Sequence, residues 1–69
     1  MKDFYAIEKV GYRYYVIKAV FNDDLIPVSD IAHRTLEAAK AEAARLGFEV
    51  QSVGDIYNIL ADFQCQTAL

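Results

Sequence analysis

The chain has 69 residues, a hydrophobic fraction of 55% and a formal net charge of −3. A chain this short predicts a single domain, residues 1–69, near the lower size limit for independent folding. The acidic balance argues against non-specific binding to nucleic acid, which needs a basic surface, and no apolar run is long enough to span a bilayer.

The chain contains one cysteine, Cys65, so an internal disulfide is excluded and a reducing compartment is indicated. No basic residue lies near Cys65 in the sequence, and we expect it to be a small buried apolar group rather than a nucleophile. The first ten residues lack the uninterrupted apolar segment of a secretory signal. We therefore expect a cytoplasmic protein that is complete as given.

Two stretches near the N-terminus, Phe4–Lys9 and Tyr12–Phe21, are rich in aromatic and β-branched residues and predict two strands. The two residues between them end in Gly11 and predict a hairpin turn, because glycine readily takes a positive φ. In that register Glu8 lies opposite Arg13, a favourable cross-strand charge pair.

Both faces of this hairpin are apolar, which is typical of strands that are buried on both sides. One face carries Phe4, Ala6, Tyr15, Ile17, Ala19 and Phe21. The opposite face carries Tyr5, Ile7, Tyr14, Val16 and Val20, together with Lys9 and Lys18.

The next segment, Asn22–Asp24, predicts a turn, because Asn and Asp side chains readily bond to nearby backbone groups. Leu25–Val28 predicts a third strand, and Pro27 indicates an edge position because proline cannot donate to the ladder. The extended segment can continue to about Ala32, since the helical pattern begins only at Thr35.

The clearest helical pattern spans Thr35–Leu46, with Thr35 as the N-cap and Gly47 as the left-handed residue that ends the helix. A start at Ser29 or Asp30 is the alternative. The apolar residues at helical spacing are Leu36, Ala39, Ala43 and Leu46. Because the alanines bury little area but permit a close approach, this pattern favours a helix packed on a sheet of bulkier side chains.

After the helix, Phe48–Val53 alternates between apolar and polar residues and predicts a strand. The dipeptide Gly54-Asp55 then fits the turn of a type II′ hairpin. The following segment, Ile56–Cys65, fits either a helical stripe or an alternating strand. We predict a strand, because the segment follows a hairpin signal and is rich in β-branched and aromatic residues.

Together these elements predict an α+β fold, an antiparallel sheet of four to five strands in the order β-β-β-α-β-β with one helix, about 35–46, on one face. A single short helix cannot cover both apolar faces. We therefore expect an exposed apolar face with tyrosines, and a patch of this kind on a small protein normally marks an interaction surface.

The sequence contains no phosphate-binding loop, no dinucleotide fingerprint and no paired-cysteine metal spacing. His33 is the only histidine and is expected to be a loop residue at the helix entrance, although Asp30 is close enough in sequence to be a partner for a catalytic base. We expect no catalytic, cofactor-binding or metal-binding residues, and we do not expect an enzyme.

The residues expected to contact a partner are tyrosines, which suit interfaces, and aspartates that form an acidic patch. They are Tyr5, Tyr12, Tyr14, Asp23, Asp24 and Asp30. In size, acidity and helix-on-sheet plan the chain resembles the small phage-encoded anti-CRISPR and other anti-defence proteins. The resemblance implies an inhibitor in the host cytoplasm that blocks the nucleic-acid-binding groove of a CRISPR effector without catalysis.

Two other functions fit the same pattern. The open face, or the edge at Leu25–Val28, could pair with a second copy of the chain in a homodimer. Alternatively, the tyrosines could stack on single-stranded nucleic acid, helped by basic residues near the first hairpin. These are Lys2, Lys9, Arg13 and Lys18.

Overall fold

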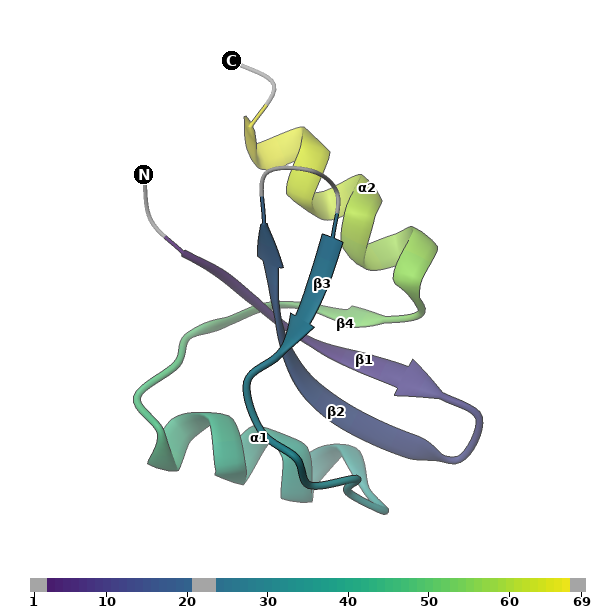
Figure 1. Ribbon diagram of the computed structural model, residues 1–69, viewed down its shortest axis with the longest axis vertical. Helices are drawn as coiled ribbons and strands as arrows, with labels where there is room; N and C mark the ends of the chain where they lie inside the picture. The colour runs from purple at the N-terminus through teal and green to yellow at the C-terminus, as the bar shows by residue number, and fades with distance from the viewer. Residues whose placement is uncertain (1–2, 21–23, 68–69) are drawn as a thin grey trace.

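A computed structural model describes residues 3–20 and 24–67 of the chain, and within them it contains one four-stranded sheet and two helices (Figure 1). The elements follow in the order β1 (Phe4–Val10), β2 (Arg13–Val20), β3 (Asp24–Pro27), α1 (Leu36–Arg45), β4 (Val50–Gly54) and α2 (Ile56–Thr67). The α+β class is therefore confirmed, whereas the predicted element order is not.

The sheet has the strand order β3-β2-β1-β4 and is mixed. Its first three strands form an antiparallel meander, but β4 runs parallel to β1. The prediction of a purely antiparallel sheet is wrong because the chain reaches β4 through a helical crossover, which brings it back in the direction of β3 and β1. The predicted third strand is present, one residue earlier than expected.

The turn of the β1–β2 hairpin lies one residue further along the chain than predicted. Gly11, with φ +62°, and Tyr12 form the connection, and Val10 lies opposite Arg13. Glu8 therefore lies opposite Tyr15, not Arg13. This register differs by two residues from the predicted one, and because side chains alternate with period two, each residue stays on its expected face.

Beyond β3 the chain continues beside β2 without regular strand structure. The amide of Val28 donates to the carbonyl of Val16 at 3.1 Å, and His33 and Tyr14 exchange two backbone hydrogen bonds of 2.8 and 2.9 Å. The strand itself ends at Pro27, but the extended course expected to about Ala32 is seen in this pairing.

Helix α1 agrees with its predicted bounds to within one residue. The Thr35 hydroxyl accepts a hydrogen bond from the Ala38 amide at 3.1 Å, and Gly47 leaves the helix with φ +81°. Ala39 and Ala43 are fully buried against the sheet, whereas Leu46 is 36% exposed. The docking face therefore consists of the two alanines and the half-buried Leu36, and it does not include the terminal leucine as predicted.

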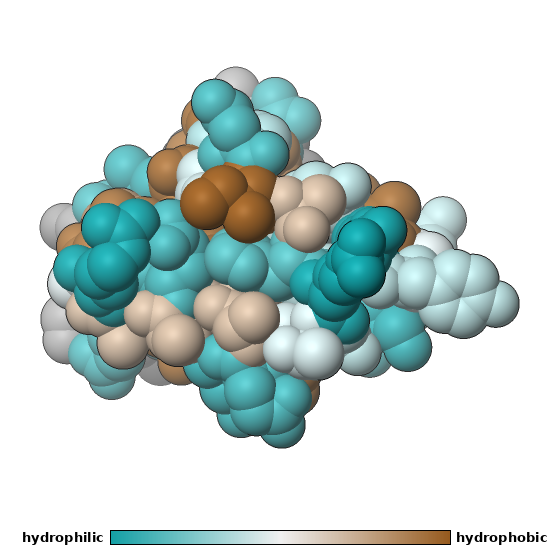
Figure 2. All heavy atoms as spheres, turned by 90° about the horizontal axis from the view of Figure 1, so that it is seen from below, coloured by the Kyte–Doolittle hydropathy of each residue, from teal (hydrophilic) through white to brown (hydrophobic). Residues whose placement is uncertain are grey.

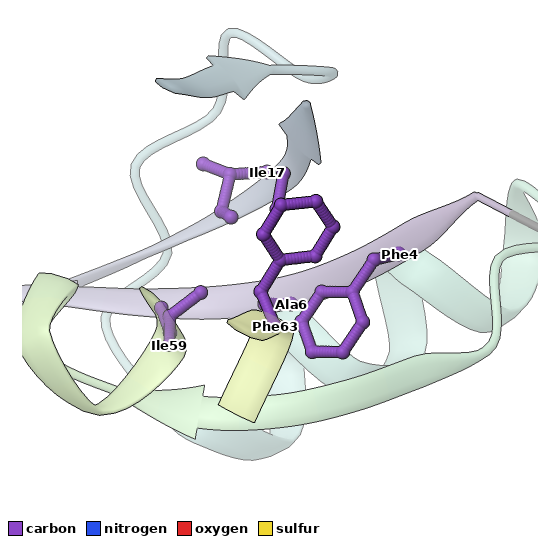
Figure 3. Packing of buried hydrophobic residues seen from close by; sticks show 6 residues of the cluster. Phe4, Ala6, Ile17, Ile59 and Phe63 are labelled. Atoms are coloured by element: carbon purple, nitrogen blue, oxygen red, sulfur yellow. The ribbon is translucent and has the colours of Figure 1, made fainter. Parts of the chain in front are cut away.

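The segment after β4 is a helix, so the predicted fifth strand is wrong. Gly54 does not begin a hairpin; it ends β4 with φ +153°, and Asp55 caps α2 by accepting a hydrogen bond from the Asn58 amide at 2.9 Å. The helix lets Ile59 and Phe63, one turn apart, reach the sheet together, as Figure 3 shows. The same geometry turns Cys65 to the surface, so the expectation that it is buried is also wrong.

Both faces of the sheet are thus covered by a helix from the same chain. On the α1 side the buried cluster is Ile7, Val16, Ala39 and Ala43. On the α2 side it is Phe4, Ala6, Ile17, Ala19, Ile59 and Phe63 (Figure 3). The accessible surface of 4710 Å² is close to the roughly 4,400 Å² typical of a folded monomer of this mass. The expectation of one wholly exposed apolar face is therefore wrong.

Each helix is also held by a carboxylate and a serine. On α2, Asp62 accepts a hydrogen bond of 2.6 Å from the hydroxyl of Ser52, which is buried in β4. On α1, Glu42 accepts one of 3.3 Å from Ser29 and is bound by the Arg45 guanidinium at 2.9 to 3.1 Å. The hydrogen bonds from Arg45 lower the pKa of Glu42, although partial desolvation opposes the change.

Candidate protein-binding site

An open groove of about 220 Å³ lies on the α2 side of the sheet, over β1, β2 and β3. It is lined by Glu8, Val10, Tyr15, Ile17, Leu25 and Pro27. Alternation along each strand turns these residues to the same face as the buried cluster of Phe4 and Ile17. The groove is therefore a continuation of that apolar face, not a separate cavity.

The groove exists because α2 covers only part of this face. Its large side chains, Ile59 and Phe63, pack on the part of the sheet around Phe4 and Ala6 (Figure 3). Farther along β1, toward the hairpin, Val10 is 52% exposed. The sheet thus continues as an apolar surface beyond the area that the helix anchors reach.

One charged group lines this apolar surface. Glu8 is half-buried, and its carboxylate makes no hydrogen bond or ion pair within the described residues. Tyr15 lies directly opposite it on β2, and the exposed Arg13 is two residues before Tyr15 on the same face. The groove therefore combines aliphatic walls, a phenol ring and one carboxylate.

The surface on the α1 side of the molecule has a different character. Figure 2 views the protein from the α1 side, where hydrophilic and weakly apolar residues predominate and a few strongly hydrophobic side chains are also exposed. The exposed residues of α1 itself are charged side chains and alanines: Glu37, Ala38, Lys40, Ala41, Ala44 and Arg45. This surface is typical of a solvated helix face.

Two of the tyrosines expected to contact a partner pack on the α1 side and are half-buried. Tyr5 stacks on Phe48 with ring centroids 4.2 Å apart, and its hydroxyl donates to Asp3 at 3.3 Å. Tyr14 packs against the α1-side cluster, with the Lys9 ammonium 5.9 Å from its ring centroid. Both rings contribute to packing within the fold.

The other expected residues do not gather in one place. Tyr12 is 92% exposed at the tip of the β1–β2 hairpin. Asp24 is the exposed first residue of β3 and lies opposite Val20, at the other end of β2. Because β2 has eight residues, the two side chains are separated by about 23 Å along the strand. Asp30 is exposed in the loop before α1. Asp23, like Phe21, lies outside the described residues.

Sequence reasoning did not name the groove residues as a site. Alternation already places Glu8 and Val10 on the face of Tyr15, and Pro27 marks the neighbouring edge. Extending the face assignment to the end of β1 could therefore have found the lining. The position of the open area could not be found, because it depends on where α2 docks.

The basic residues near the first hairpin are divided between the two faces. Lys9 and Lys18 lie on the α1 side, and Lys18 is paired with Asp3 at 3.3 Å, whereas Arg13 lies on the groove side. Lys2 falls outside the described residues. This division does not favour a continuous track for a nucleic-acid backbone.

His33 and the acidic side chains are the candidates for a metal-binding or catalytic group. Within residues 3–20 and 24–67, no group of three or more His, Cys, Asp or Glu side chains is placed to hold a metal ion. His33 bridges to Tyr14 through its backbone, and its Nε2 atom is buried without a hydrogen-bond partner. The described part of the chain contains no helix with the length and apolarity needed to cross a membrane.

Comparisons with protein-family models, with curated proteins and with solved structures found no match to this chain.

Proposed function

We propose that this protein is a non-catalytic protein-binding module that docks through the groove and the adjacent hairpin tip. The observation that carries the proposal is the apolar groove of about 220 Å³ that α2 leaves uncovered on its side of the sheet. Val10 and Tyr12, exposed by 52% and 92%, extend this apolar surface toward the hairpin tip. Tyrosine and aliphatic side chains around a depression are typical of the core of an interface.

Affinity capture with matched variants tests this proposal. Val10→Arg places a cationic side chain beside Glu8 in the groove, and Ala41→Arg makes the same change in charge on the exposed face of α1. Proteins retained by the wild type and by Ala41→Arg should be lost with Val10→Arg, while circular dichroism shows that both variants are folded. Equal capture by all three proteins would contradict a docking role for the groove.

The partner class that we propose is a nucleic-acid-binding protein such as a CRISPR effector subunit. The support is the net charge of −3 on a chain of 69 residues, together with the resemblance to small anti-defence inhibitors. An acidic protein of this size can occupy a basic groove and exclude nucleic acid sterically and electrostatically. The test is target-DNA binding by purified CRISPR effectors, which the wild type should inhibit and Val10→Arg should not.

Self-association is the second candidate. Of the two edge strands of the sheet, β4 is better suited than β3 to pair with a second copy of the chain. The β3 edge is four residues long and carries Pro27, whereas β4 presents Val50–Gly54 without proline or charge. Unprotected edges of this kind pair readily with another strand. Light scattering after size exclusion separates the candidates: a dimer that Val53→Lys converts to a monomer supports pairing through β4, and a wild-type monomer excludes it.

A further inference from the structure

We propose that the groove binds the cationic side chain of an arginine or lysine on the partner protein. The inference rests on the proposed function, because it names the chemistry that the partner presents to that surface. It is carried by the position of the Glu8 carboxylate, which has no partner among residues 3–20 and 24–67, in a groove whose other walls are apolar or aromatic.

The apolar walls suit the stem of such a side chain. Arginine and lysine bury their methylene groups along apolar surface while a polar group holds the charged end. Here Val10, Ile17, Leu25 and Pro27 provide the apolar surface. An uncharged apolar occupant would instead bury Glu8 without a partner, and an acidic one would be repelled by it.

Tyr15 places an aromatic ring next to the carboxylate. Glu8 and Tyr15 are direct cross-strand partners, and such side chains start about 5 Å apart. A guanidinium can stack on a tyrosine ring while its edge bonds a carboxylate, which combines a cation–π contact with a charge-assisted hydrogen bond. The pair Glu8–Tyr15 therefore favours arginine over lysine.

Arg13 is the cation of the chain itself that lies nearest to this pair along the same face of β2. It lies opposite Val10, its side chain is exposed, and it makes no ion pair with Glu8 in the described structure. Its positive charge weakens the attraction of the groove for a second cation. Removing the two charges, Glu8 and Arg13, should therefore change the affinity in opposite directions.

The test uses defined peptides as probes and two-dimensional NMR of the full chain as the readout. The probe is the N-acetylated, C-amidated peptide Gly-Leu-Arg-Leu-Gly, and the matched peptide has citrulline, the neutral isostere, in place of arginine. The arginine peptide should shift the amide signals of Glu8, Tyr15 and Leu25, and should bind about three- to tenfold more tightly than the citrulline peptide.

The variants separate the charge from the shape of the groove. Glu8→Gln should remove the preference for arginine, and Arg13→Gln should raise the affinity for the arginine peptide about two- to threefold. Glu37→Gln, which makes the same change on the exposed side of α1, should leave both peptides unaffected.

Equal binding of the two peptides, an unchanged preference in Glu8→Gln, or no binding of either peptide would overturn the inference. None of these outcomes contradicts the proposed function, which is tested separately by the loss of captured proteins in Val10→Arg. If Val10→Arg loses no protein, the proposed function fails even where the peptide preference is present.

Discussion

On the α1 side of the sheet the strands supply the bulky side chains and the helix supplies alanines. Ile7 and Val16 from β1 and β2 pack against Ala39 and Ala43. On the α2 side both partners supply large side chains: Ile59 and Phe63 come from the helix, and Phe4 and Ile17 come from the sheet, with Ala6 and Ala19 among them. The α1 layer therefore pairs bulky strand residues with small helix residues, whereas the α2 layer joins large side chains from both.

This difference has energetic and functional consequences. An alanine interface gives little area for each residue, so α1 depends on a close approach along its length. The α2 interface depends on two large anchors over a limited area, and the sheet beyond them stays open as the groove. The α2 layer should therefore be more sensitive to truncation, and the α1 layer to enlargement.

The largest expected effect is from Phe63→Ala on the α2 side. Phe63 is 6% exposed and packs edge-to-face on Phe4 with ring centroids 5.3 Å apart. Truncation should lower the free energy of unfolding by about 3–5 kcal/mol, a large part of the stability of a domain this small. Urea unfolding checks this, with Tyr57→Ala, 80% exposed on the same helix, as a control expected within about 0.5 kcal/mol.

Enlargement tests the α1 side. Ala43→Leu adds bulk at a site that is 1% exposed against the sheet and should destabilise by about 1–3 kcal/mol. The control, Ala41→Leu, makes the same substitution at an exposed position of α1. It should be close to neutral, because leucine is nearly as good a helix former as alanine. An unchanged or higher melting temperature for Ala43→Leu would show that this helix does not lie close to the sheet.

The polar contact of α2 is next in size. Asp62→Ala removes the acceptor of the buried Ser52 hydroxyl and should cost about 1–2 kcal/mol, because that group is left unsatisfied. Adding Ser52→Ala to the same chain should cost little more, since the orphaned group is removed as well. Additive losses in this double-mutant cycle would mean that the two side chains act independently.

The two N-caps allow a direct comparison between the helices. Thr35→Ala on α1 and Asp55→Ala on α2 each remove a side-chain acceptor for a first-turn amide, and each should cost about 1 kcal/mol. Amide hydrogen exchange should show the loss of protection in the helix whose cap was removed. If Asp55→Ala left protection in α2 unchanged, the helix start at Ile56 would not depend on the cap.

The smallest effect concerns pH and the α1 side. Because the Arg45 hydrogen bonds lower the pKa of Glu42 in the folded protein, this pair contributes stability above the pKa of an unfolded glutamate, about 4.3. The contribution is lost as the pH falls through the lowered pKa. Wild type should therefore exceed Glu42→Gln in stability at neutral pH, and the difference should shrink below about pH 4. A difference that is constant between pH 7 and pH 3 would exclude this linkage.

The sequence by itself determined the features that depend on neighbouring residues. The cap at Thr35 and the left-handed Gly47 define α1 to within one residue, because capping involves groups only three or four positions apart. The two faces of the β1–β2 hairpin were also predictable, since alternation holds even when the register shifts by two residues.

Only the tertiary structure decided the state of Ile56–Thr67 and the place of β4. The segment fits both periodicities, and it becomes a helix because Ile59 and Phe63 can then bury together on a sheet face that would otherwise stay exposed. Asp55 was a local signal for this helix, but it fits a hairpin turn equally well. The same long-range packing determines where the groove lies, because the groove is the part of this sheet face that α2 does not cover.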